Sequence, residues 1–189
     1  MASTIFEIEK KSLFEVHFKA YKAAAEQGNA QAQSILGWCY EDGTGVEKDE
    51  QKAVEWYQKA AEQGLVDAQF NLGICYEDGT GVEKDEQKAV EFYQKAAEQG
   101  DSDAQNNLGS CYANGIGVEK DVEKAVELYQ KAVEQGHAVA QTNLGYCYQC
   151  GTGVEKDVEK AFELYQQAAE QGHAAAQTNL GITIKMELE

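Results

Sequence analysis

The sequence predicts an all-α solenoid, a stack of helix–loop–helix repeats that are each 36 residues long. Three observations predict this class. A shift of 36 residues brings one Leu-Gly pair into register five times, at 36–37, 72–73, 108–109, 144–145 and 180–181. Apolar residues within each unit recur at the i, i+3, i+4, i+7 spacing of a helix. Proline is absent and glycine is frequent, which is typical of helices that glycine punctuates.

The register divides the chain into four complete units and two partial ends. We place the units at 29–64, 65–100, 101–136 and 137–172, an N-terminal capping helix at 1–28, and a C-terminal partial repeat with a first helix only at 173–189. One helix hairpin cannot bury both of its faces, whereas stacked neighbours can, so an array is expected.

The first helix of the first unit is expected at about 30–41. Asn29 and Asp101 are good N-cap residues for this element, whereas Leu65 in the second unit is not. Gly43 suits the left-handed position that ends the helix.

The second helix of each unit is expected to begin after an aspartate N-cap and to end at a glycine such as Gly64. The N-cap residues are Asp49, Asp85, Asp121 and Asp157. The apolar stripe of the first such helix consists of Ala53, Val54, Trp56, Tyr57, Ala60 and Ala61. Glu55 and Lys59 indicate a solvated face with i,i+4 ion pairs.

The two ends depart from the repeat. Ser12 and Glu15 predict a capping box for a helix that reaches Gln27. The segment from His173 to about Met186 predicts a first helix with no second helix behind it. A second copy of the chain could cover the apolar face left open there, which is one route to end-to-end self-association.

The repeat resembles the Sel1-like repeat family, which is related to tetratricopeptide repeats. The second unit carries the matching residues Ala68, Leu72, Gly73, Tyr76, Gly79, Gly81, Val82, Asp85, Lys88, Ala89, Tyr93, Lys95, Ala96, Ala97 and Gly100. Val133 and Gln167 depart from the pattern in later units. The resemblance covers about 12–186 and implies a right-handed superhelix of antiparallel helix pairs, a scaffold or adaptor role, and no shared catalytic residues.

The charge excludes several partner classes. With 16 basic and 33 acidic residues, the formal net charge is −17. Such a chain repels phosphate backbones and anionic membrane surfaces, so we expect neither nucleic acid nor membrane as a partner. The start of the sequence lacks the features of a secretory signal. Together with cysteines expected to be reduced, this favours a cytoplasmic location.

A candidate binding face emerges when the five first helices are compared with one another. Residues that repeat share one arc of the helix, and residues that change occupy the opposite arc, which we therefore expect to face solvent. The predicted partner-binding residues are Gln31, Ser34, Trp38, Asp67, Phe70, Asn71, Ile74, Asp103, Asn106, Asn107, Ser110, Val139, Thr142, Asn143, Tyr146, Thr178, Asn179 and Ile182.

The resemblance places these first helices on the inner, concave surface. Trp38, Phe70, Ile74, Tyr146 and Ile182 would then form an apolar surface with aromatic anchors, which is typical of a binding site for a peptide or helix of a partner protein. An asparagine ladder at Asn71, Asn107, Asn143 and Asn179 could hydrogen-bond a peptide backbone. The alternative interpretation is sequence drift on an unconstrained face.

The cysteines do not indicate catalysis. Cys39, Cys75, Cys111 and Cys147 are equivalent, and helix packing should hold neighbouring copies about 8–10 Å apart, too far for disulfides. We expect them to be reduced and buried. Cys147 and Cys150 form a C-x-x-C pair, but it lies near a helix C-terminus, where the dipole raises a thiol pKa.

We predict no enzyme, metal site or cofactor. His137 and His173 lie one repeat apart, too far to share a metal, and are expected at helix starts. The glycine loops lack the Lys-Ser/Thr of a phosphate loop. Two alternatives stay open: a small-molecule binder or weak hydrolase, because some disulfide-rich relatives are associated with β-lactams, and a self-assembling or engineered repeat protein.

Overall fold

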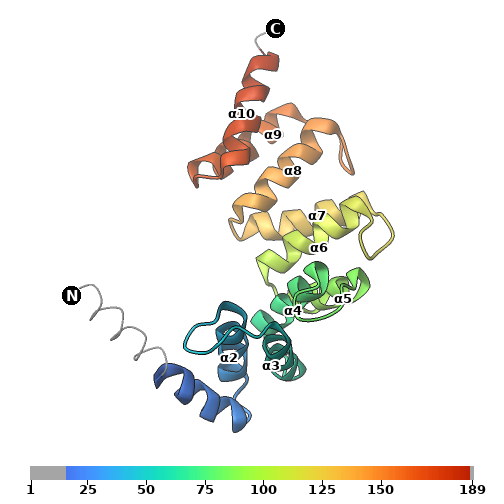
Figure 1. Ribbon diagram of the computed structural model, residues 1–189. Coiled ribbons are helices and arrows are strands. Elements are labelled where there is room, and N and C mark those ends of the chain that lie inside the picture. The colour runs from blue at the N-terminus through green and yellow to red at the C-terminus, as the bar shows by residue number, and fades with distance from the viewer. Residues whose placement is uncertain (1–15, 188–189) are drawn as a thin grey trace, which may run out of the picture. The chain divides into compact units, whose positions relative to one another are not determined.

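The computed structural model of the chain describes residues 16–187, with side chains as far as Thr183. Every regular element in this part of the chain is a helix (Figure 1). A helix over 16–26 comes first. The others are α2 (Ala30–Asp42), α3 (Glu50–Glu62), α4 (Val66–Asp78), α5 (Glu86–Glu98), α6 (Ser102–Asn114), α7 (Val122–Glu134), α8 (Ala138–Cys150), α9 (Val158–Glu170) and α10 (Ala174–Glu187). The predicted helix–loop–helix order is confirmed.

The chain forms two compact units, Met1–Lys95 and Ala96–Glu189, and the boundary between them falls inside α5. In the first unit, α3 packs against both α2 and α4. In the second unit, α6, α7, α8, α9 and α10 pack each against the next. Within each unit, these helices are thus covered by their neighbours in sequence, as stacking of hairpins requires.

The core of each hairpin is a tyrosine of the second helix lying against a glycine of the first. A Cβ added at Gly37 would be 2.7 Å from the Tyr57 ring, and one at Gly145 would be 2.8 Å from the Tyr165 ring. Only glycine allows so close an approach, which explains the repeated Leu-Gly pair. The Tyr57 hydroxyl donates to Glu41 at 2.6 Å, and burial together with this bond raises the pKa of Tyr57.

Buried glutamines join successive helices. Gln33 of α2 donates from Nε2 to the Ala25 carbonyl at 3.1 Å, and its Oε1 accepts from Gln63 Nε2 at 2.7 Å. In the second unit, Gln105 donates to the Ala97 carbonyl at 3.3 Å and accepts from Gln135 at 2.9 Å. One amide therefore ties a helix both to the end of the preceding helix and to the end of the following one. We call this arrangement the glutamine relay.

The helix caps follow the sequence. The Asp49 side chain accepts from the Lys52 backbone N–H at 3.0 Å, and Asp85, Asp121 and Asp157 make the same bond in their repeats. Asn29 and Asp101 also cap as predicted, Leu65 does not, and Gly43 is left-handed with φ of 80°. The predicted capping box of Ser12 and Glu15 lies outside the described residues.

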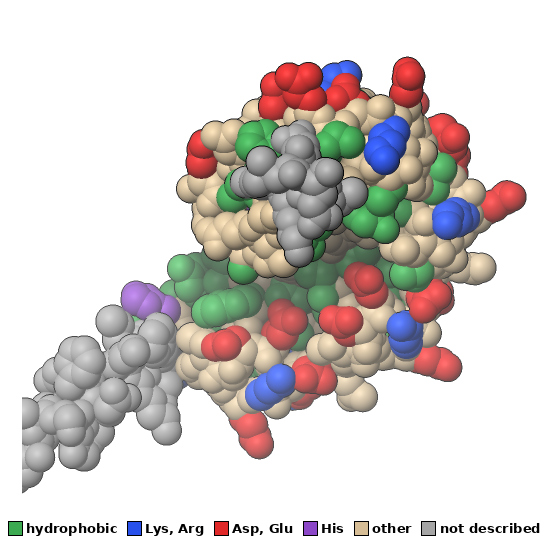
Figure 2. All heavy atoms as spheres, turned by 90° about the horizontal axis from the view of Figure 1, so that it is seen from above, with side chains coloured by type: hydrophobic (Ala, Val, Ile, Leu, Met, Phe, Trp, Pro, Cys, Tyr) green, Lys and Arg blue, Asp and Glu red, His purple; other side chains and the backbone are tan. Residues whose placement is uncertain are grey.

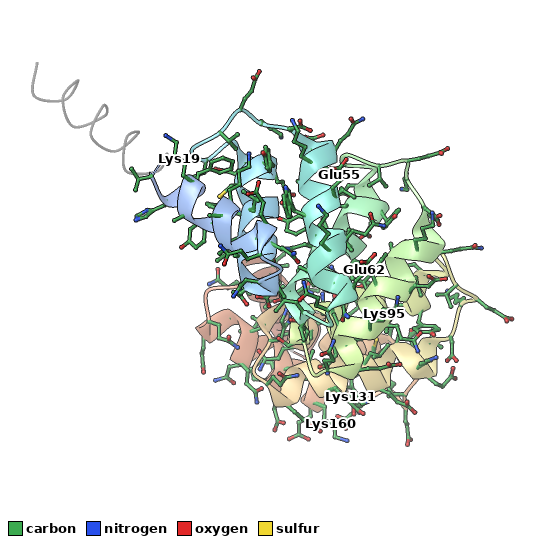
Figure 3. All side chains as sticks on the ribbon, turned by 90° about the horizontal axis from the view of Figure 1, so that it is seen from below. Lys19, Glu55, Glu62, Lys95, Lys131 and Lys160 are labelled. Atoms are coloured by element: carbon green, nitrogen blue, oxygen red, sulfur yellow. The ribbon has the colours of Figure 1, made fainter. Side chains whose placement is uncertain are left out.

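The outer face of the second helices carries charged side chains. Figure 3 shows Glu55 and Glu62 on α3 and Lys131 on α7 directed away from the ribbon. The predicted ion pair between Glu55 and Lys59 is wrong: Lys59 Nζ lies 3.9 Å from the centre of the Trp56 ring. A cation–π contact with an adjacent aromatic ring competes well with an exposed ion pair, which contributes little in water.

Candidate partner-binding face

The first helices of the first unit present apolar side chains at the variable positions. Trp38 of α2 is 49% exposed, and Gln31 and Asp67 are also exposed. Phe70 is half-buried because its ring packs against Tyr93, with the ring centres 5.9 Å apart. Asn71 and Ile74, the other variable residues of α4, are half-buried. Trp38 is thus the large apolar group that this unit leaves open to a partner.

The second unit exposes a second apolar set. Tyr146 is 57% exposed, Ile182 is 50% exposed and Val139 is 40% exposed. The polar members Asp103 and Thr178 are exposed, whereas Asn107, Ser110, Asn143 and Asn179 are half-buried. In the space-filling view, hydrophobic side chains lie among acidic ones on the surface (Figure 2). The variable positions of the second unit therefore combine exposed aromatic and aliphatic groups with the acidic Asp103 and several polar side chains.

Three predicted face residues are buried, and the expectation that they face solvent was wrong. They are Ser34, Asn106 and Thr142, which occupy equivalent positions in three repeats. In the second unit, the next first helix covers this position: Asn106 bonds to Asn143 of the following repeat, and Thr142 lies 2.8 Å from His173 Nδ1. The position thus serves contact between repeats.

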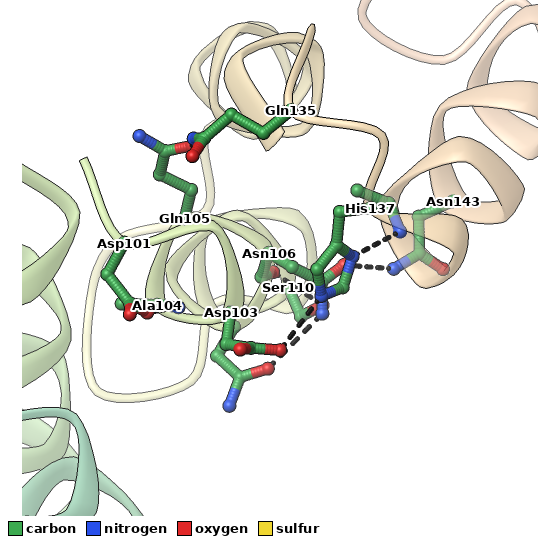
Figure 4. Close-up of polar contacts among 11 residues, drawn as sticks. Asp101, Asp103, Ala104, Gln105, Asn106, Ser110, Gln135, His137 and Asn143 are labelled. Carbon is green, nitrogen blue, oxygen red and sulfur yellow. Dashed lines mark hydrogen bonds and ion pairs between the residues drawn. The ribbon is translucent and has the colours of Figure 1, made fainter. Parts of the chain in front are cut away.

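The asparagines of the second unit bond to one another (Figure 4). Asn143 Nδ2 donates to Asn106 Oδ1 at 2.9 Å, and Asn106 Nδ2 donates to Asn107 Oδ1 at 3.2 Å. Ser110 Oγ donates to the Asn106 carbonyl at 3.1 Å. Of these bonds, the one from Asn143 to Asn106 joins α8 to α6, so two ladder residues, Asn107 and Asn143, already have partners within the chain.

His137 adds a further contact between α6 and α8. We call the polar contacts of Asn106, Asn143, Asp103, Thr142, His137 and His173 between successive first helices the polar seam. His137 is the N-cap of α8, because its Nδ1 accepts from the Ala140 backbone N–H at 3.0 Å. With Nδ1 as an acceptor, Nε2 carries the proton and donates to Asp103 Oδ1 at 3.0 Å. The prediction that His137 lies at a helix start is confirmed, and the histidine also ties α8 to α6.

The cysteine predictions agree with the structure where it tests them. Cys39, Cys75, Cys111 and Cys147 are buried free thiols, and Cys150 is an exposed one. Burial raises the pKa of Cys75 to about 12, and burial followed by the nearby Cys150 raises that of Cys147. A raised pKa lowers the thiolate fraction, which makes these sulfurs poor nucleophiles.

Sequence reasoning missed some exposed apolar groups. Val16 and Tyr21 of the first described helix and Ile116 of a loop are exposed. The first two lie outside the aligned first helices, so the comparison of repeats could not find them. In the part of the chain that the structure describes, no three His, Cys, Asp or Glu side chains cluster as metal ligands, and no helix has the length and apolarity of a membrane span.

Stacked helix hairpins with a Gly-Tyr core and a variable first-helix face define the class of helical-repeat proteins. The comparison with family models identifies which family of helical repeats this is. Four Sel1 repeats match, at residues 30–65, 66–101, 102–137 and 138–173, and the chain belongs to the Sel1 repeat family. This repeat is commonly a protein-interaction scaffold, and the family is generally non-enzymatic.

Solved structures with the same fold support the assignment. The protective antigen c5321 of uropathogenic Escherichia coli, which has an SLR fold, is 39% identical with a TM-score of 0.85 over 90% of this chain and 37% of its own. A Sel1 repeat protein from Oxalobacter formigenes is 40% identical with a TM-score of 0.85, over 95% of this chain and 71% of its own. The chain thus spans little more than a third of the E. coli antigen.

A more distant match is the cysteine-rich protein B of Helicobacter pylori. It is 30% identical with a TM-score of 0.55, over 70% of this chain and 96% of its own. No curated protein matches the chain. The family match and the solved structures confirm the all-α repeat fold predicted from the sequence.

Proposed function

We propose that the chain is a scaffold or adaptor that binds a peptide or helix of a partner protein through the exposed variable positions of the first helices in each unit. The observation that carries the proposal is the exposure of Trp38 in the first unit and of Tyr146 and Ile182 in the second, on a chain with a net charge of −17. Large exposed aromatic and aliphatic groups are energetically unfavourable in water and typically serve as anchors in protein interfaces.

The polar surround favours a basic partner. The net charge of −17 would speed the encounter with a positively charged segment and repel acidic ones. Asp67 and Asp103 are exposed on the same variable positions. Asn143 donates from Nδ2 to Asn106, and its side-chain amide oxygen could accept a hydrogen bond from a partner backbone N–H.

A displayed peptide library can test the proposal. Peptides selected on the native chain would be measured by calorimetry against a Trp38→Ala, Tyr146→Ala, Ile182→Ala triple variant. We expect at least a tenfold weaker affinity, because the loss of even one interface anchor costs about 1–2 kcal/mol. Phe70 is left intact because it packs against Tyr93.

The matched control changes the exposed lysines of the second helices, Lys59→Ala and Lys131→Ala, which should leave the affinity within about twofold. Equal affinity of the triple variant and the native chain would place the binding site away from the first helices. Retained helicity in circular dichroism excludes unfolding as the cause of a loss.

A further inference from the structure

The second unit contains an apolar pocket that the variable face does not include. It has a volume of about 400 Å³ and is lined by residues of α7, α8 and α9. Its apolar walls come from Val133, Leu144, Tyr148 and Leu164. Because three helices from two consecutive repeats contribute, the pocket belongs to the packing of repeats and not to one hairpin.

The corresponding place in the first unit is filled by an aromatic ring. Two repeats earlier in the sequence, Phe92 stands where Leu164 stands and Tyr76 where Tyr148 stands. The rings of Phe92 and Tyr76 stack with centres 5.6 Å apart and planes 5° from parallel. Lys95 Nζ lies 4.8 Å from the centre of the Phe92 ring. The first unit therefore contains a lysine–phenylalanine–tyrosine stack.

The fourth repeat, in the second unit, lacks two members of this stack. Leu164 supplies no ring, as Leu128 supplies none in the third repeat, but the third repeat keeps a lysine, Lys131. In the fourth repeat Gln167 takes the place of that lysine and accepts a hydrogen bond from Gln141 at 3.2 Å. The substitution of Val133 for Ala61 adds apolar volume but does not restore the cover. Tyr148 remains half-exposed, whereas the equivalent tyrosines are buried. Those tyrosines are Tyr40, Tyr76 and Tyr112.

An occupant that replaces the missing stack would carry an aromatic ring, and the charges around the pocket indicate that it would also carry a positive charge. Glu134 and Glu163 line it. The lysine at the pocket, Lys160, lies 5.2 Å from the Tyr148 ring centre and pairs with Asp157 at 3.3 Å, so its charge is already partly compensated. The rim is thus left acidic, on a chain with a net charge of −17. A cation close to an aromatic ring would complement both features.

We propose that this pocket docks an aromatic side chain flanked by lysine or arginine in a basic segment of a partner protein. The partner's ring stacks on Tyr148 as Phe92 stacks on Tyr76, and its cation lies near Glu134 and Glu163. The site is separate in its residues from the first-helix face, so the chain can hold two segments at once. A scaffold with two docking sites gains avidity when both segments belong to one partner.

Blocked peptides of the sequence Lys-Phe-Lys, Lys-Leu-Lys and Glu-Phe-Glu provide the test, with NMR shifts and calorimetry on the full chain. We expect Lys-Phe-Lys to bind about fivefold to tenfold more tightly than Lys-Leu-Lys, because an aromatic pair adds to the burial of apolar area. Glu-Phe-Glu should bind more weakly than either, because the rim repels it.

Variants that give one repeat the residues of the other at these equivalent positions make the test specific. Leu164→Phe would fill the pocket with the ring that the first unit already accommodates, so it should lower the affinity for Lys-Phe-Lys about tenfold while the chain stays folded. The double change Phe92→Leu, Lys95→Gln should open an equivalent pocket and raise the stoichiometry from one peptide to two. Tyr146→Ala on the first-helix face should leave both values unchanged, which separates this proposal from the proposed function.

Three results would overturn the proposal. Equal binding of Lys-Phe-Lys and Lys-Leu-Lys would exclude ring stacking. Unchanged affinity in Leu164→Phe would place the peptide elsewhere. A concentration-dependent mass that falls in Leu164→Phe, without peptide binding, would identify a second copy of the chain as the occupant.

Discussion

Two helices of the second unit have nearly the same sequence and different surroundings. Residues 138–145 of α8 and 174–181 of α10 differ only where Val139 is replaced by Ala175. In α8 the Gln, Thr, Leu and Gly of this segment are buried, whereas in α10 the same four residue types are exposed or half-buried. The difference lies in the neighbours: α8 packs against α7 and α9, and α10 packs against α9. Burial in this fold is therefore conferred by adjacent repeats and not by the sequence of a helix alone.

The largest effect is expected for the leucines. Leu144→Ala should lower the free energy of unfolding by about 3 kcal/mol, because it removes a fully buried side chain and leaves a cavity. Leu180→Ala should cost about 1 kcal/mol, because Leu180 is half-buried. Urea unfolding followed by circular dichroism measures both values. Equal costs at low protein concentration would contradict the comparison. A cost at Leu180 that grows with concentration would show that a second copy covers α10.

The glycines should respond with opposite signs. Gly145→Ala would bring a Cβ to 2.8 Å from the Tyr165 ring, whose hydroxyl is held by Gln149 at 2.8 Å, so we expect a loss of about 2 kcal/mol. A Cβ at Gly181 meets no atom within 4 Å, so Gly181→Ala should stabilise the chain by about 0.5–1 kcal/mol through helix propensity. Thermal unfolding of the two variants beside the native chain provides the measurement. A shift of both midpoints in the same direction would be inconsistent with the role assigned to Tyr165.

The smallest effect concerns the threonines. Thr142 Oγ1 donates to the Ala138 carbonyl at 3.0 Å and lies 2.8 Å from His173 Nδ1. Thr142→Val removes both contacts in a buried place and should cost about 1 kcal/mol. Thr178→Val changes an exposed residue and should be neutral within about 0.3 kcal/mol. The same urea series measures the pair, and a neutral Thr142→Val would show that the contact with His173 does not stabilise the seam.

Much of the fold could be predicted because the repeat is local. The Leu-Gly pair, the aspartate N-caps and the glycine exits each act within one 36-residue unit, and all appear in the structure as expected. Trp38, Tyr146 and Ile182 were correctly placed on exposed positions for the same reason. The angular position of a residue around its own helix is enough to predict that these three side chains are exposed.

The remainder depends on contacts between repeats, which the angle around one helix does not describe. Asn106 and Thr142 lie on the variable arc, yet the next first helix covers them. The pocket at Tyr148 likewise requires side chains of three helices. The sequence did contain a sign of this pocket, because Leu164 stands where the first two repeats have the aromatic residues Trp56 and Phe92. The loss of the ring indicates a pocket only when it is known that the Phe92 ring stacks on Tyr76.

The glutamine relay has a consequence for how the chain responds to its solvent. Amide groups donate and accept hydrogen bonds without carrying a charge, so neither protonation nor screening by salt alters them directly. Gln33 and Gln105 thus hold the joints between helices with bonds that are indifferent to pH and ionic strength. Changes in salt can weaken or strengthen the attraction of the acidic surface for a basic partner while the spacing of the helices that present the binding residues stays the same.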